Sequence, residues 1–120
     1  MSMRKAQWKA PNVGWIKVNV DGAFVEQTGQ AGAGVVARNH VGKTIFTAWR
    51  VLFRCSSAVE TEMLACLEGL RLAAEWAHGP VTLEGKKQDR SEIGNLVAEA
   101  RGITRLLQAV EFVQVKRWGL

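Results

Sequence analysis

The sequence lacks the features that mark several classes of protein. Cysteine is scarce: Cys55 and Cys66 are the only two, and they have neither C-x-x-C spacing nor neighbouring histidines. This pattern predicts free thiols in a reducing compartment. No apolar run approaches the roughly 18 residues that span a bilayer, and the polar N-terminus has no apolar signal-peptide core. We therefore expect an intracellular protein, nuclear or cytoplasmic, with no signal peptide and no place in a membrane.

Negative charge is also in short supply. Sixteen lysine and arginine residues outnumber eleven aspartate and glutamate residues, giving a formal net charge of +5. Such an excess fits a polyanionic partner, because each neutralised phosphate releases condensed counterions. It also fits a basic domain with solvated lysines, so charge alone leaves both interpretations open. The length of 120 residues and a hydrophobic content of 48% are ordinary for one soluble domain.

The first half of the chain has the pattern of a β-meander. Residues 1–13 are polar, basic and contain proline, which predicts an N-terminal arm ahead of a domain at 14–120. Residues 15–21 alternate between apolar and polar side chains with period two, which predicts a strand. Residues 33–38 and 44–53 are predicted to be the next two strands.

The second half changes to helical periodicity. Ser57 and Glu60 have the spacing of a capping box, and the helix that they start is expected to run to Ala77. The remaining predicted elements are a strand at 81–84, a polar loop at 85–90, a helix at 91–108 and a strand at 109–115.

The resulting order, βββαβαβ, predicts an α/β fold with a mixed sheet. Right-handed crossovers place the fourth strand beside the first and the fifth beyond it, in the order 3-2-1-4-5. The fourth and fifth strands are then parallel to the first.

Two acidic residues are candidates for a functional site. Asp21 closes the first predicted strand, where a side chain can enter the crevice in which α/β proteins bind ligands. Glu62 lies near the start of the first helix, beside its apolar stripe. Both also have ordinary explanations: Asp21 as a turn-forming aspartate before Gly22, and Glu62 as a solvated helix residue.

A resemblance favours the functional interpretation of both acids. The motifs that carry it are W-x-K-x-N-x-D-G-A from Trp15, G-x-G-V-V-A-R-N from Gly32, and S-S-x-x-x-x-E-x-x-A-x-x-x-G-L from Ser56. Together they closely resemble the RNase H-like domain of plant reverse-transcriptase-related, retroelement-derived proteins, in the ribonuclease H type 1 family. The resemblance is dense from Trp8 to Leu83 and looser from Asp89 to Arg117.

The resemblance implies a ribonuclease H-like fold and the hydrolysis of RNA–DNA hybrids. In that family four carboxylates hold two divalent ions, usually Mg²⁺, with Mn²⁺ as a substitute. Asp21 and Glu62 match the first two acids, as catalytic residues and metal ligands. We expect their carboxylates to face each other at the carboxyl end of the first strand.

The sequence departs from the family pattern at the other two acids. Lys86 occupies the position expected for the third, and the helix that normally follows it is missing, so the fold is expected to be abridged between its fourth and fifth strands. Glu84 and Asp89 are the nearby candidates to replace that acid, although neither is in register. The sequence ends at Leu120 without a fourth acid, as if truncated at the C-terminus.

Basic residues favour a surface for an RNA–DNA hybrid or duplex, although each could equally belong to a solvated face. The candidates are Lys86, Lys87, Arg90, Arg101, Arg105, Lys116 and Arg117. The tryptophans, in contrast, are expected to pack in the core or at its edge and not to stack on bases.

Two hypotheses of function therefore remain. One is an RNA–DNA hybrid ribonuclease, impaired because two of four carboxylates are missing and metal binding is weak. The alternative is a catalytically inactive, nucleic-acid-binding or relic module of a retroelement protein. A third interpretation is a spliced or truncated fragment of a longer protein. We expect a monomer.

Overall fold

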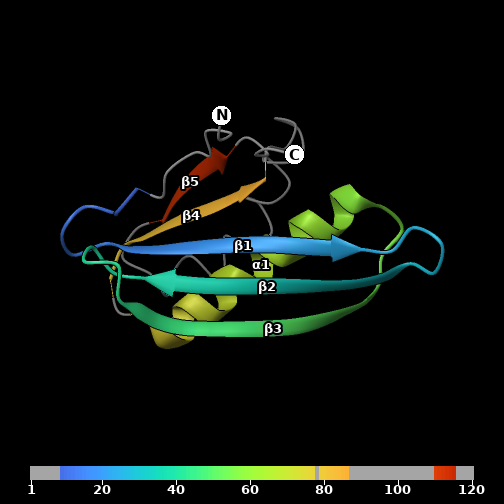
Figure 1. Ribbon diagram of the computed structural model, residues 1–120, viewed down its shortest axis with the longest axis horizontal. Coiled ribbons are helices and arrows are strands. Elements are labelled where there is room, and N and C mark those ends of the chain that lie inside the picture. The colour runs from blue at the N-terminus through green and yellow to red at the C-terminus, as the bar shows by residue number, and fades with distance from the viewer. Residues whose placement is uncertain (1–8, 78, 87–109, 116–120) are drawn as a thin grey trace, which may run out of the picture.

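The N-terminal strands form an antiparallel meander in the computed structural model of the protein, which describes residues 9–77, 79–86 and 110–115. The strands are β1 (Ile16–Phe24), β2 (Gln30–Arg38) and β3 (Thr44–Arg54) (Figure 1). Both β1 and β2 are longer than the sequence pattern predicts. The pairing of Ala23 with Gly32 and of Phe24 with Ala31 extends them. These cross-strand hydrogen bonds outweigh the low strand propensity of the glycines.

The meander is followed by α1 (Ala58–Trp76), the one helix among the described residues. It begins as predicted, because the Ser57 hydroxyl accepts a hydrogen bond from the Glu60 N–H at 3.0 Å. The second half of the predicted capping box differs: the Glu60 carboxylate accepts from the Ser56 N–H, at 2.6 Å, and not from Ser57. No helix in the described ranges is long and apolar enough to cross a membrane.

Two parallel strands complete the sheet. β4 (Val81–Lys86) pairs with β1, and β5 (Val110–Val115) pairs with β4, both in parallel. The order β3-β2-β1-β4-β5 confirms the predicted topology.

The predicted loop at 85–90 was wrong at its start. Gly85 pairs with Gln114 and Lys86 with Val115, so both belong to β4. Pairing with the next strand, which lies far ahead in sequence, extends β4 past the glycine. The predicted helix at 91–108 and the abridgement between the fourth and fifth strands lie outside the described residues. The division into an arm at 1–13 and a domain at 14–120 stays a prediction.

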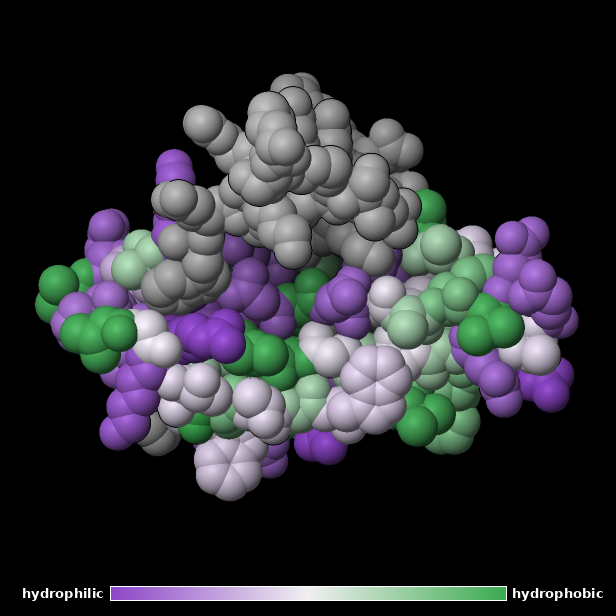
Figure 2. Space-filling model, viewed as in Figure 1, coloured by the Kyte–Doolittle hydropathy of each residue, from purple (hydrophilic) through white to green (hydrophobic). Residues whose placement is uncertain are grey.

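The core lies between α1 and one face of the sheet. Its fully buried members include Val18, Val35, Leu70 and Leu83. Gly69 lets the helix approach β1 closely, since a Cβ there would lie 2.4 Å from Val20 Cγ1. Figure 1 looks onto the other face of the sheet, with α1 behind it. On that face, green and white residues are mixed with purple ones (Figure 2).

Candidate functional site

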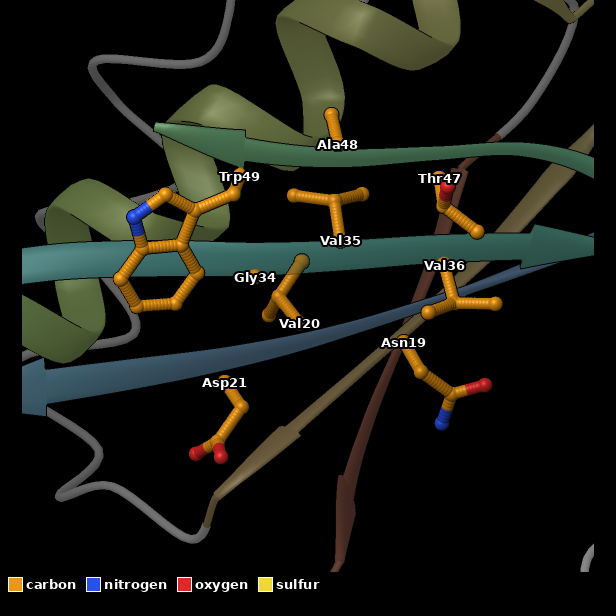
Figure 3. Close-up of a pocket in the computed structure, with 9 residues that line it drawn as sticks. All are labelled: Asn19, Val20, Asp21, Gly34, Val35, Val36, Thr47, Ala48 and Trp49. Carbon is orange, nitrogen blue, oxygen red and sulfur yellow. The ribbon is translucent and has the colours of Figure 1, made fainter. Parts of the chain in front are cut away.

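Asp21 lies in β1 on the sheet face that α1 does not cover. The preceding residue, Val20, packs against Gly69 of α1, and strand side chains alternate, so Asp21 is directed to the opposite face. Its side chain is exposed. It borders an open pocket of about 520 Å³ (Figure 3). The pocket is lined by Asn19, Val20, Asp21, Gly34, Val35, Val36, Thr47, Ala48 and Trp49.

Glu62 approaches the same point of β1 from α1. A Cβ on Gly22 would lie 3.1 Å from Glu62 Oε1 and 3.0 Å from Thr61 Cγ2, so the Glu62 carboxylate lies against the glycine that follows Asp21. The structure thus brings the two predicted acids close together along the chain of β1: Asp21 belongs to the strand, and Glu62 of α1 lies against the next residue, Gly22. That their carboxylates face each other stays a prediction.

Glu84, one of the two proposed substitute acids, is engaged elsewhere. Its Oε2 lies 2.6 Å from Lys17 Nζ, and its Oε1 accepts a hydrogen bond from Asn19 Nδ2 at 2.9 Å. Lys17 also donates to the backbone carbonyl of Lys9. This network buries the lysine, with only 4% of its surface exposed, although it is one of the polar residues in the alternating pattern of β1. Both carboxylate oxygens of Glu84 therefore already have cationic or amide partners.

Lys86 is the last residue of β4. The parallel register pairs Asn19 with Glu84, and two further residues along each strand would bring position 86 opposite position 21. That Lys86 takes the place of the third acid stays a prediction. Asp89 lies outside the described residues, as do Lys87, Arg90, Arg101, Arg105, Lys116 and Arg117.

Cys66 is a buried neighbour of the site that sequence reasoning treated only as a free thiol. Burial, and then the negative charge of Glu62 one helical turn earlier, raise the pKa of the Cys66 thiol from 9.0 to about 12. Both described cysteines are free, as predicted. Cys66 stays protonated at neutral pH and is not a nucleophile there.

The donor set does not fit a two-metal centre within the described part of the chain. No three histidine, cysteine, aspartate or glutamate side chains gather there to hold a metal ion. Asp21 and Glu62 offer two carboxylates, whereas Glu84 is bound to Lys17. Mg²⁺ takes six oxygen ligands, of which one or two are usually carboxylates and the others waters or phosphates, so Asp21 and Glu62 suffice for one ion and not for two.

Trp49 is the pocket residue that the sequence did not single out. It belongs to β3, the edge strand, and packs against Gly32 of β2. The rest of the indole is open, with 61% of the residue exposed. The sequence signal that could have identified it is the pair Gly32-x-Gly34 facing an aromatic residue on the next strand.

Comparisons with known proteins agree with this architecture. The chain resembles the RNase H1 of the halophilic archaeon Halobacterium salinarum NRC-1, with a TM-score of 0.72, 19% identity and 87% of each chain covered. The N-terminal RNase H domain of a Mycobacterium tuberculosis protein has a TM-score of 0.67 at 16% identity, covering 86% of this chain and 83% of that one.

A third similar structure is LC11-RNase H1 from compost, in complex with an RNA/DNA hybrid. Its TM-score is 0.58 at 18% identity, covering 85% of this chain and 86% of that one. No curated protein sequence matches the chain. At these identities the structural likeness establishes the fold alone. The pattern of the reverse transcriptase-like family matches residues 19–118, so this chain, with its ribonuclease H-like fold, belongs to the reverse transcriptase-like family.

Proposed function

We propose that this protein is a nucleic-acid-binding RNase H-like domain that recognises RNA–DNA hybrids and hydrolyses them slowly or not at all. The proposal rests on Lys86, which lies two residues past Glu84, the last residue of β4 that pairs with β1, and which stands where the resemblance leads us to expect an acid. The domain retains the fold and two acids, while the charge at the third position is reversed.

The consequence of that reversal is electrostatic. The resemblance to ribonucleases H implies Mg²⁺ or Mn²⁺ at the acidic site, where the ions would activate water and stabilise the leaving oxygen. Asp21 and Glu62 would hold such an ion, and together they supply two negative charges. A lysine within several ångströms would oppose the ion by an amount on the order of a few kcal/mol, at an effective dielectric constant near 20. Glu84 cannot compensate while it neutralises Lys17.

Binding of nucleic acid has separate support. LC11-RNase H1, which shares this fold, is in complex with an RNA/DNA hybrid. The net charge of +5 favours a polyanion. We further propose that the protein derives from a plant retroelement, on the strength of the motifs that begin at Trp15, Gly32 and Ser56. We also propose that it is intracellular.

A cleavage assay on an RNA–DNA hybrid, with Mg²⁺ or Mn²⁺, tests the proposal. We expect the protein to bind the hybrid and to cleave it at a rate far below that of Halobacterium salinarum RNase H1 assayed in parallel. Lys86→Asp should raise both Mg²⁺ affinity, measured by calorimetry, and the cleavage rate. Lys87→Asp makes the same charge change one residue later, and we expect it to raise neither.

Two results would contradict the proposal. A wild-type rate comparable to that of the archaeal enzyme, abolished by Asp21→Asn, would show that the acidic site is intact. Failure of the wild-type protein to bind any hybrid or duplex at low salt would show that it is not a nucleic-acid-binding domain.

A further inference from the structure

The indole of Trp49 rests on a glycine surface built into the sheet. A Cβ on Gly32 would lie 2.5 Å from Trp49 Cζ2, and a Cβ on Gly34 would lie 3.5 Å from Trp49 Cε3. Both glycines belong to β2, and the Trp49 ring lies over that strand beside Gly34 (Figure 3). One side of the indole is thus supported by backbone, while 61% of the residue is exposed.

This aromatic surface is in line with the candidate acidic site. Trp49 pairs with Gly34, and Gly34 pairs with Asp21, so the three residues cross the sheet in one row. Neighbouring strands lie about 4.8 Å apart, which puts the backbones of Trp49 and Asp21 about 10 Å apart. The open pocket of about 520 Å³ lies along this row. Its size is within the range of small-ligand sites.

The chemistry of the row fits a nucleotide. A supported indole offers a stacking surface to any base, since every base has a π-face. The Asp21 carboxylate, at the other end, is a hydrogen-bond acceptor for an exocyclic amine or a ribose hydroxyl. Bases inside a duplex are already stacked on their neighbours on both sides, whereas an unpaired base is free to lie on the ring.

We infer that the pocket between Trp49 and Asp21 binds an unpaired nucleotide, in a single-stranded segment adjoining a hybrid. The inference rests on the proposed function and adds a class of substrate to it: a hybrid with a single-stranded RNA overhang. A second copy of this chain on the same face is the competing occupant. Docking a second copy would take the exposed Asp21 side chain out of water, and withdrawing a charged group from water costs free energy, whereas a stacked base leaves its polar edges in water.

Fluorescence anisotropy with two labelled probes tests the inference: a blunt RNA–DNA hybrid, and the same hybrid with a four-nucleotide RNA overhang. Trp49→Ala should weaken binding of the overhang probe by about 5- to 150-fold, the range for loss of one stacked base. Binding of the blunt probe should not change. Trp76→Ala is the matched control, because Trp76 at the end of α1 is also 61% exposed, and we expect it to bind both probes as the wild type does.

Two glycine variants test whether the backbone of β2 must support the Trp49 ring, because they leave the indole in place. Gly32→Ala would place a methyl group 2.5 Å from the ring and displace it, whereas Gly34→Ala would make an ordinary contact at 3.5 Å. We therefore expect Gly32→Ala to lose overhang binding as Trp49→Ala does, and Gly34→Ala to retain most of it. Circular dichroism of each variant checks that the fold is intact, and Trp49→Phe, which keeps a stacking ring, should retain partial binding.

The outcomes distinguish this inference from the proposed function. If the wild type binds both probes equally, or if Trp49→Ala weakens both equally, the pocket does not hold an unpaired nucleotide, although hybrid binding stands. If the wild type binds neither probe, the proposed function fails and the inference fails with it. If sedimentation shows a wild-type dimer that Trp49→Ala converts to a monomer, the surface is a contact between copies and the inference is wrong.

Discussion

The Lys17 ammonium lies 2.6 Å from the carboxylate of Glu84, joining β1 to the parallel strand β4. Their side chains are 5% and 15% exposed, so the pair is largely withdrawn from solvent. Asn19 donates to the same carboxylate and completes the network. Glu84 is therefore a structural residue of the sheet, and it cannot serve as a metal ligand without leaving a buried lysine uncompensated.

Breaking this pair should destabilise the fold. Lys17→Met leaves Glu84 buried without its cation, and we expect a loss of about 3–5 kcal/mol in the free energy of unfolding. Adding Glu84→Gln should recover part of that loss, because the glutamine carries no charge and can still accept from Asn19. Urea denaturation of the wild type, both single variants and the double variant measures the coupling. Additive effects would show that the two side chains do not interact.

Gly22 is expected to control the position of Glu62. In Gly22→Ala the new methyl group would lie 3.0 Å from Thr61 Cγ2 and 3.1 Å from Glu62 Oε1. These contacts are too tight to persist, so the carboxylate must move away from β1. We expect weaker Mn²⁺ binding than in the wild type, measured by calorimetry, while the same change at Gly34 leaves Mn²⁺ binding unaltered. Equal Mn²⁺ affinity in all three proteins would contradict this role for Gly22.

Gly69 should be needed for the packing of α1 on the sheet. Gly69→Ala gains about 1 kcal/mol of helix propensity, but its methyl group would lie 2.4 Å from Val20 Cγ1. Overpacking a core typically costs about 1–3 kcal/mol, so we expect net destabilisation in thermal or urea unfolding. Combining Gly69→Ala with Val20→Ala should cost less than the sum of the single changes. The smaller side chain at position 20 removes the clash, and the methyl group at position 69 fills the space that it leaves. A stabilised Gly69→Ala variant would show that the helix can shift at no cost.

The raised pKa of the Cys66 thiol predicts a loss of folding stability at high pH. Its pKa of about 12 in the folded protein lies above the ordinary value of 9.0, so the folded state holds the proton more tightly than the unfolded state. The thiol's contribution to stability is complete below about pH 9 and is lost as the pH rises towards 12, with a slope of at most about 1.4 kcal/mol per pH unit.

Comparing wild type with Cys66→Ala isolates that contribution. Other groups titrate alike in both proteins, so the difference in unfolding free energy should shrink between pH 8.5 and pH 10.5, approximate limits chosen to bracket the onset of thiol titration. Curves that stay parallel over this interval would mean that the thiol is not buried beside Glu62.

Hybrid binding should weaken steeply with salt. Each phosphate neutralised by a lysine or arginine adds about −0.9 to the slope of log affinity against log salt on B-form DNA. Anisotropy titrations at several salt concentrations measure that slope. Affinity that is independent of salt would argue against the basic residues of the sequence as the binding surface.

Local sequence determined much of the fold. Period-two alternation defined β1, and the Ser57 and Glu60 spacing defined the start of α1, because both signals depend on neighbours within a few residues. The chain order alone then restricted the sheet to β3-β2-β1-β4-β5, since right-handed crossovers leave few alternatives. The motifs also singled out the acids at positions 21 and 62 as candidate site residues, and their role stays a prediction.

Tertiary structure decided the features that depend on distant partners. Lys17 is one of the polar residues in the alternating pattern of β1, and Glu84, 67 residues later, withdraws it from water. Gly85 and Lys86 had loop composition, yet pairing with β5 makes them strand. The position of the Trp49 ring depends on two glycines of the neighbouring strand, β2. In each case the deciding contribution is an interaction between strands. Local propensity does not include such interactions, because they depend on the register of the folded sheet.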